Sequence, residues 1–83
     1  MESPTLVQKG ILTLQKIALT NPNWWLKLVA TQQVAFVKDV FTDIINEGGN
    51  DSLKPLVESL NNSLQHIKNT ETDPKLLEQY TDL

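Results

Sequence analysis

Residues 20–49, TNPNWWLKLVATQQVAFVKDVFTDIINEGG, decide the fold. Asn21-Pro22 pairs a residue that caps helices with a proline that suits the first turn of a helix. Gly48-Gly49 is typical of a helix end. The apolar residues between these two signals do not alternate as they would in a strand. The segment therefore predicts a helix over residues 22–47, about 26 residues long, which is longer than any other helix the chain can form.

The apolar side chains of this helix cover well over half of its circumference. One line contains Leu26, Val29, Phe36, Val40 and Ile44 with Gln33 beside it, and another contains Trp25, Leu28, Ala35, Val37, Phe41 and Ile45. A helix that is apolar nearly all round is usually buried on several sides. We expect it to be central in the fold, to extend past its neighbours by on the order of 12 to 15 Å, and to serve both its own core and a surface outside.

Similar signals mark the other helices. Ser3-Pro4 and Asp73-Pro74 each place a cap residue before a proline, and residues 50–52 offer three cap residues after the glycines. One apolar seam supports the third helix: Leu53, Val57, Leu60, Leu64 and Ile67. The expected helices are residues 4–19, 22–47, 52–69 and 74–80. The last is short, and it either docks on the bundle or frays.

A chain of 83 residues has room for one domain. We predict an all-α fold over residues 1–83, a small bundle of three main helices with a short C-terminal helix, in which the long second helix is central. A core of this size is marginal alone, so a partner or oligomerisation would help to stabilise it.

Composition and charge exclude several classes of protein. The chain has no cysteine, which rules out disulfides and fits a cytoplasmic location. It has no arginine and only seven lysines in an acidic chain, so nucleic-acid binding is not expected. Polar residues interrupt the apolar run, so no transmembrane segment is expected, and the N-terminus does not resemble a secretory leader.

The net charge of −3 is unevenly distributed. Residues 1–38 hold four lysines and one glutamate, a net charge of +3, whereas residues 39–83 hold three lysines and nine acids, a net charge of −6. The split either orients an antiparallel partner or second copy, or reflects uneven solvation of the surface.

The chain has few residues that could act as a catalytic nucleophile or general base. His66 is its single histidine and lies off the seam of the third helix, so we expect it to face water. Ser59 and Ser63 are near it in sequence, but neither lies in a strained nucleophile turn, and a general base needs a nucleophile and an orienting group beside it. We expect a non-enzymatic protein with no catalytic residue and no cofactor.

Asp39, Asp43 and Glu47 recur every four residues of the second helix and so share one face. Three carboxylates in line could bind a hard cation. Such sites usually draw ligands from loops or several helices, and the Glu-x-x-His motif of a di-metal bundle is absent. A solvated polar stripe is therefore the preferred interpretation, and no metal site is predicted.

The adjacent tryptophans have two interpretations. In the first, one of Trp24 and Trp25 closes the end of the bundle while the other is half exposed. In the second, at least one belongs to a binding surface, where tryptophan is enriched. The candidate partner-binding residues are Trp24, Trp25, Leu28, Phe36 and Phe41.

Gln32 and Gln33 interrupt the apolar run midway. There are two interpretations. Either one glutamine points inward and fixes the register of a helix interface, as a buried polar residue does in a coiled coil, or both glutamines lie at the boundary between the core and solvent. The residues leave these alternatives open.

Residues 6–45, LVQKGILTLQKIALTNPNWWLKLVATQQVAFVKDVFTDII, resemble helical proteins of polyhydroxyalkanoate granules. The Asn-Pro entry, an aromatic residue and then glutamines in a helix are similar to segments that precede the catalytic domain of polyhydroxyalkanoate synthases. The amphipathic helices resemble phasins, which coat the granule, although this chain has fewer alanines and lacks a synthase catalytic motif. The resemblance covers about residues 5–47 and implies a non-catalytic coat or adaptor protein.

The expected function is that of a small non-enzymatic binding protein, such as an adaptor, an inhibitor or an immunity-type protein. It would act through an apolar helix face on a protein partner or on a second copy of itself. The alternative is a phasin-like amphipathic coat protein on a polymer or lipid surface.

Overall fold

A computed structural model describes residues 3–83 as an all-α fold of four helices. The helices are α1 (Ser3–Thr20), α2 (Trp24–Asn46), α3 (Lys54–Thr70) and α4 (Pro74–Tyr80), and a 3₁₀ turn, η1 (Asp51–Leu53), precedes α3. The predicted bundle of three main helices with a short C-terminal helix is therefore confirmed.

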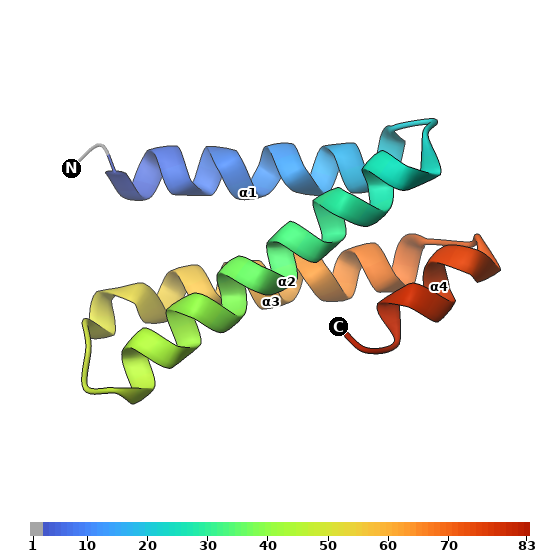
Figure 1. The fold of residues 1–83 in the computed structure, drawn as a ribbon. Coiled ribbons are helices and arrows are strands. Elements are labelled where there is room, and N and C mark those ends of the chain that lie inside the picture. The colour runs from blue at the N-terminus through green and yellow to red at the C-terminus, as the bar shows by residue number, and fades with distance from the viewer. Residues whose placement is uncertain (1–2) are drawn as a thin grey trace.

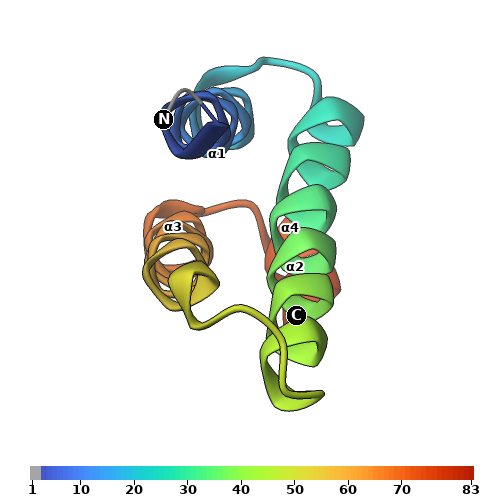
Figure 2. The same cartoon turned by 90° about the vertical axis from the view of Figure 1, so that its left-hand side faces the viewer.

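The helices form two layers. α1 and α3 lie side by side and run in the same direction, and α2 runs back diagonally across both of them (Figure 1). Seen from the end of the bundle, α1 and α3 are on one side of α2, and α4 lies in the same layer as α2 (Figure 2). α2 contacts every other helix, so the prediction that it is central is confirmed.

Two side-chain hydrogen bonds fix the pairing of α1 with α3. Gln8 Nε2 donates to Ser59 Oγ (3.1 Å), and Ser63 Oγ donates to Gln15 Oε1 (2.7 Å). Both serines therefore face α1. His66 is exposed on α3, as predicted.

The start of α2 differs from the prediction. Its N-cap is Asn23, whose Oδ1 accepts hydrogen bonds from the N–H groups of Trp25 (2.9 Å) and Leu26 (3.3 Å). Asn21 Oδ1 instead accepts from the N–H of Asn23 (2.8 Å) and shapes the turn before the helix. Both asparagines can cap a helix, and the chain uses the second, so the start predicted at residue 22 was two residues early.

The end of α2 follows the glycine signal. Gly48 has a φ of 81°, its N–H donates to the carbonyl of Ile45 (3.1 Å), and the N–H of Gly49 donates to that of Ile44 (2.8 Å). This is the Schellman pattern, in which a residue in the left-handed region closes a helix. α2 has 23 residues against 18 in α1 and 17 in α3. The excess is about 8 to 9 Å at 1.5 Å per residue, less than the predicted 12 to 15 Å.

The core lies between the two layers and draws on all four helices. The largest fully buried side chains come from α2, α3 and α4: Val34, Thr31, Leu60, Leu64, Ile67, Leu76 and Tyr80. Helix α1 contributes the fully buried Ala18. The predicted seam of α3 is confirmed at Leu60, Leu64 and Ile67, whereas Leu53 and Val57 are half-buried. Leu76 and Tyr80 dock α4 on the bundle, which settles the alternative of docking or fraying for this helix.

Candidate functional site: the outer seam of α2

An apolar seam on α2 is left in contact with solvent. Its members recur every three or four residues: Leu26, Val29, Gln33, Phe36, Val40 and Ile44. We call these six residues the outer seam. Phe36 is 63% exposed, and Leu26, Val40 and Ile44 are also exposed, while Val29 is half-buried.

The outer seam is exposed because the rest of the bundle packs on the opposite face of α2. That face carries the buried residues of the helix: Leu28, Ala30, Thr31, Val34 and Ala35. In the view down the bundle, α1 and α3 lie on one side of α2 (Figure 2). The two apolar lines read from the sequence thus have different surroundings. The line that contains Leu28 and Ala35 meets the core, and the line from Leu26 to Ile44 meets solvent.

Both tryptophans are exposed in the first turn of α2. Trp24 is 53% exposed and Trp25 is 56% exposed, and their rings meet edge to face with centroids 5.7 Å apart and planes at 86°. The interpretation in which one tryptophan closes the end of the bundle is therefore wrong. The Asn23 cap places both indoles in the first turn of α2.

The structure separates the five candidate partner-binding residues. Trp24, Trp25 and Phe36 are exposed. Leu28 is only 5% exposed and belongs to the core, and Phe41 is half-buried and packs against the core. Leu28 and Trp25 are three residues apart and are therefore near each other on the helix surface. The neighbouring helices, however, cover the side of α2 that carries Leu28. The exposed surface instead includes Leu26, Val40 and Ile44, which the spacing of the first apolar line already grouped with Phe36.

The glutamines do not enter the core. Gln32 and Gln33 are both exposed, and Gln33 occupies the middle of the outer seam. The polar residue that α2 buries is Thr31, which lies against Tyr80 of α4. Every buried side-chain nitrogen or oxygen in the described part of the chain has a hydrogen-bond partner, so the core needs no further polar group to complete it.

Charge is distributed unevenly along the exposed face of α2. Asp39, Asp43 and Glu47 are exposed at its C-terminal end, whereas its first turn carries no acidic residue. The N-terminus of a helix carries a partial positive charge, so the two ends of this face differ in sign. Among residues 3–83, no group of three or more His, Asp or Glu side chains could hold a metal ion.

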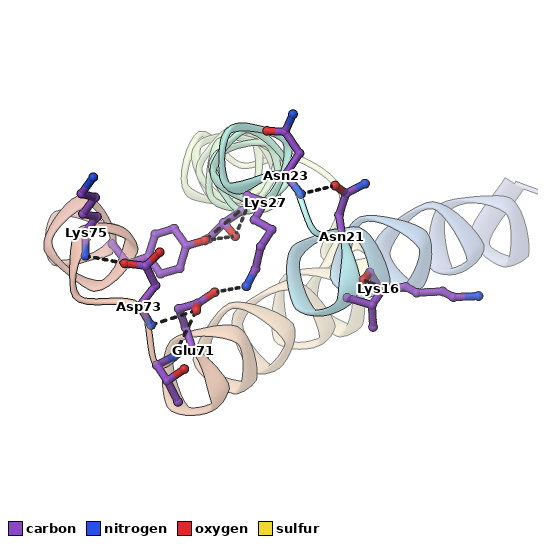
Figure 3. A network of polar contacts seen from close by, with 11 residues as sticks. Lys16, Asn21, Asn23, Lys27, Glu71, Asp73 and Lys75 are labelled. Atoms are coloured by element: carbon purple, nitrogen blue, oxygen red, sulfur yellow. Dashed lines mark hydrogen bonds and ion pairs between the residues drawn. The ribbon is translucent and has the colours of Figure 1, made fainter.

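An ion pair on the side of α2 away from the outer seam holds the first turns of this helix in place. Lys27 Nζ lies 2.7 Å from Glu71 Oε1, and the Glu71 side chain is 5% exposed. The other carboxylate oxygen of Glu71 accepts hydrogen bonds from the N–H groups of Thr72 and Asp73 (3.0 Å each). Figure 3 shows these groups converging from α2, the end of α3 and the start of α4. Burial by itself raises the pKa of Glu71, but Lys27 and the two N–H groups together hold that pKa below its ordinary value.

A second contact ties α4 to the same turn of α2. The hydroxyl oxygens of Thr31 and Tyr80 lie 3.1 Å apart, and they lie 2.9 and 3.5 Å from the carbonyl oxygen of Lys27. Burial raises the pKa of Tyr80, and this effect outweighs the hydrogen bond from Thr31. The inner face of α2 is therefore fixed by specific polar contacts, which keep the outer seam turned to solvent.

None of the helices in the described residues is long and apolar enough to cross a lipid bilayer. No protein-family model, curated protein or solved structure matches the chain. The resemblance to phasins and to accessory segments of polyhydroxyalkanoate synthases therefore stays a prediction, and the argument for function rests on the outer seam.

Proposed function

We propose that the chain is a small non-enzymatic binding protein, of the adaptor, inhibitor or immunity type, that acts through the outer seam of α2. The occupant of the seam is a helical protein segment, either from a partner or from a second copy. One observation carries the proposal: α2 completes the core with one face and leaves a second apolar face, with Phe36 at its middle, in solvent. A cytoplasmic location agrees with the absence of cysteine.

The spacing of the seam suits a helix as its occupant. From Leu26 to Ile44 the side chains of the outer seam recur at steps of three and four and form a narrow stripe along about 27 Å of α2. Helix-in-groove and coiled-coil recognition use the same spacing of apolar residues. Full burial of a phenylalanine or leucine contributes about 1.5 to 3 kcal/mol, so covering the exposed parts of Phe36, Leu26, Val40 and Ile44 favours association.

The test compares two charge substitutions at equally exposed positions. Phe36→Glu changes the outer seam, and Leu12→Glu changes a leucine of α1 that is 60% exposed and lies outside the seam. Each purified chain is immobilised and used to capture proteins from an extract of the native host, and its self-association is measured in parallel. Circular dichroism shows whether the three chains keep the same helix content.

The proposal predicts that binding, to a captured protein or to a second copy, is lost with Phe36→Glu and kept with Leu12→Glu. Equal binding by all three chains would show that the seam is not the binding surface. Absence of any captured protein together with a monomeric wild-type chain would contradict the proposal as a whole.

The exposed tryptophan pair favours a second candidate, a phasin-like coat protein on a polymer or lipid surface. Trp24 and Trp25 are adjacent, exposed indoles in the first turn of α2, and indole rings suit an interface between apolar and aqueous phases. Light scattering with liposomes and with polymer particles tests this function. Binding that is lost in the Trp24→Ala/Trp25→Ala double variant supports it, and no association of the wild type with either particle removes it.

A further inference from the structure

The outer seam is nearly symmetric about its middle residue. Leu26 lies seven residues before Gln33 and Val40 lies seven residues after it, and Val29 and Phe36 lie four before and three after. Reversal of the helix direction about Gln33 therefore exchanges Leu26 with Val40, brings Val29 to within one residue of the level of Phe36, and places Gln33 on Gln33, while Ile44 extends past the start of the other α2. A surface with this property matches a second copy of itself that runs in the opposite direction.

From this symmetry we propose that the occupant of the outer seam is a second copy of the chain, paired antiparallel through α2 about a two-fold axis at Gln33. The inference rests on the proposed function, because it names the partner for the same surface. Residues of one copy contact residues of the other reciprocally, as in other two-fold interfaces. Leu26 of each copy packs on Val40 of the other, and Val29 lies within one residue of the level of Phe36.

Gln33 gives this pairing its register. A side-chain amide has both donor and acceptor groups, so two Gln33 side chains facing each other across the axis can bond reciprocally. A slip of one helical turn would place each amide against apolar residues and leave it unpaired, which is unfavourable. A single polar residue in an apolar seam specifies register in coiled coils in the same way.

Charge selects the antiparallel orientation over the parallel one. Asp43 lies ten residues after Gln33, and the N-cap Asn23 lies ten residues before it. Antiparallel pairing thus places Asp43 of each copy beside the N-terminus of the other α2, where the helix dipole favours a negative charge and where the first turn has no acid of its own. Parallel pairing would instead place Asp39, Asp43 and Glu47 of the two copies together.

Disulfide trapping tests the register directly, because the chain has no cysteine of its own. Four single variants are prepared: Gln33→Cys, Leu26→Cys, Val40→Cys and the control Leu12→Cys. Each is oxidised alone, and Leu26→Cys is also oxidised as a mixture with Val40→Cys. Covalent dimers are quantified by mass spectrometry.

The antiparallel pairing predicts efficient dimers from Gln33→Cys alone. It also predicts that the mixture gives more of the mixed dimer than the statistical share, and that Leu12→Cys stays monomeric. Leu26→Cys dimers as abundant as those of Gln33→Cys would indicate parallel pairing and overturn the inference. If all variants gave the same yield of covalent dimer as Leu12→Cys, the inference would also be overturned.

The outcomes also separate this inference from the proposed function. If the cysteine variants do not cross-link but Phe36→Glu abolishes capture of another protein, the seam binds a partner and the second copy is excluded. If capture and self-association are both independent of Phe36, the proposed function fails together with the inference.

Discussion

Lys27 Nζ and Glu71 Oε1 lie 2.7 Å apart and join the first turns of α2 to the end of α3. The pair has little exposure to water, and Glu71 also accepts two backbone hydrogen bonds where the chain turns into α4. This pair, together with the contact between Thr31 and Tyr80, fixes the face of α2 that lies inward. The orientation of the outer seam therefore depends on contacts made on the other side of the helix.

Removing the ammonium group should lower stability. Lys27→Met keeps most of the apolar stem but leaves the Glu71 carboxylate buried without its ion partner. We expect the free energy of unfolding to fall by about 3 kcal/mol, since breaking a buried pair from one side leaves an uncompensated charge. Urea denaturation measures the change, and the double variant Lys27→Met/Glu71→Gln should recover part of it. Additive losses in the double variant would show that the two groups do not interact.

The same pair should make stability depend on pH in the acid range. The pKa of Glu71 is lower in the folded chain than its ordinary value of 4.5, so the folded state prefers the carboxylate. Its contribution is fully present above about pH 4.5 and is lost as the pH falls through the folded-state pKa. Thermal unfolding between pH 3 and 6 should therefore show a smaller acid loss in Glu71→Gln than in the wild type. Identical pH profiles would contradict this assignment.

Tyr80 should produce a loss of stability on the alkaline side. Its pKa is raised above the ordinary value of 10.0 by burial, so the folded state prefers the neutral phenol. This contribution is fully present below about pH 10 and is lost as the pH rises through the folded-state pKa. Tyr80→Phe should remove that dependence and lower the free energy of unfolding at neutral pH by about 1 kcal/mol. A variant with the alkaline profile of the wild type would contradict the prediction.

Two glycines should respond in opposite ways to alanine. Gly10 lies within α1, and a Cβ added there would have no atom within 4 Å. Gly10→Ala should therefore raise the free energy of unfolding by about 0.5 to 1 kcal/mol through helix propensity. Gly48→Ala should lower it by about 1 kcal/mol, because a φ of 81° strains a residue with a Cβ. Thermal melts of the two variants should thus shift in opposite directions, and a shift in the same direction would contradict the account of α2 termination.

Gln33 should lower the affinity of self-association and fix the register of the pairing. Gln33→Leu makes the outer seam fully apolar, so we expect tighter self-association measured by sedimentation. Without the amide pair the register is no longer fixed, so disulfide trapping of Leu26→Cys in this background should give self-linked dimers that the parent does not give. An unchanged cross-linking pattern would show that Gln33 does not set the register.

Much of the fold was predictable because its signals are local. Proline after a cap residue, the glycine pair and the apolar spacing located the helices. The start of α2 was misplaced because residues 21–23, Asn-Pro-Asn, offer two caps, and only hydrogen bonding distinguishes them. The two polar contacts that orient α2 were not predictable, since Thr31 and Tyr80 are 49 residues apart and no local spacing links them.

The candidate site was predictable only in part. The sequence grouped Leu26, Phe36, Val40 and Ile44 on one line of α2, and the structure leaves that line exposed. Helical phase does not say on which side the other helices pack, however, so Leu28 and Phe41 were placed among the binding candidates although they face the core. The same uncertainty left open whether one tryptophan closes the end of the bundle, and both are exposed.

The central claim, that two copies pair through the outer seam, is tested most directly by sedimentation equilibrium from micromolar to millimolar concentration. The wild type, Phe36→Glu and Leu12→Glu are compared at equal helix content. The account predicts that the wild type and Leu12→Glu form dimers reversibly, and that Phe36→Glu stays monomeric throughout. A monomeric wild type at the highest concentration, or dimers of Phe36→Glu as stable as those of the wild type, would contradict it.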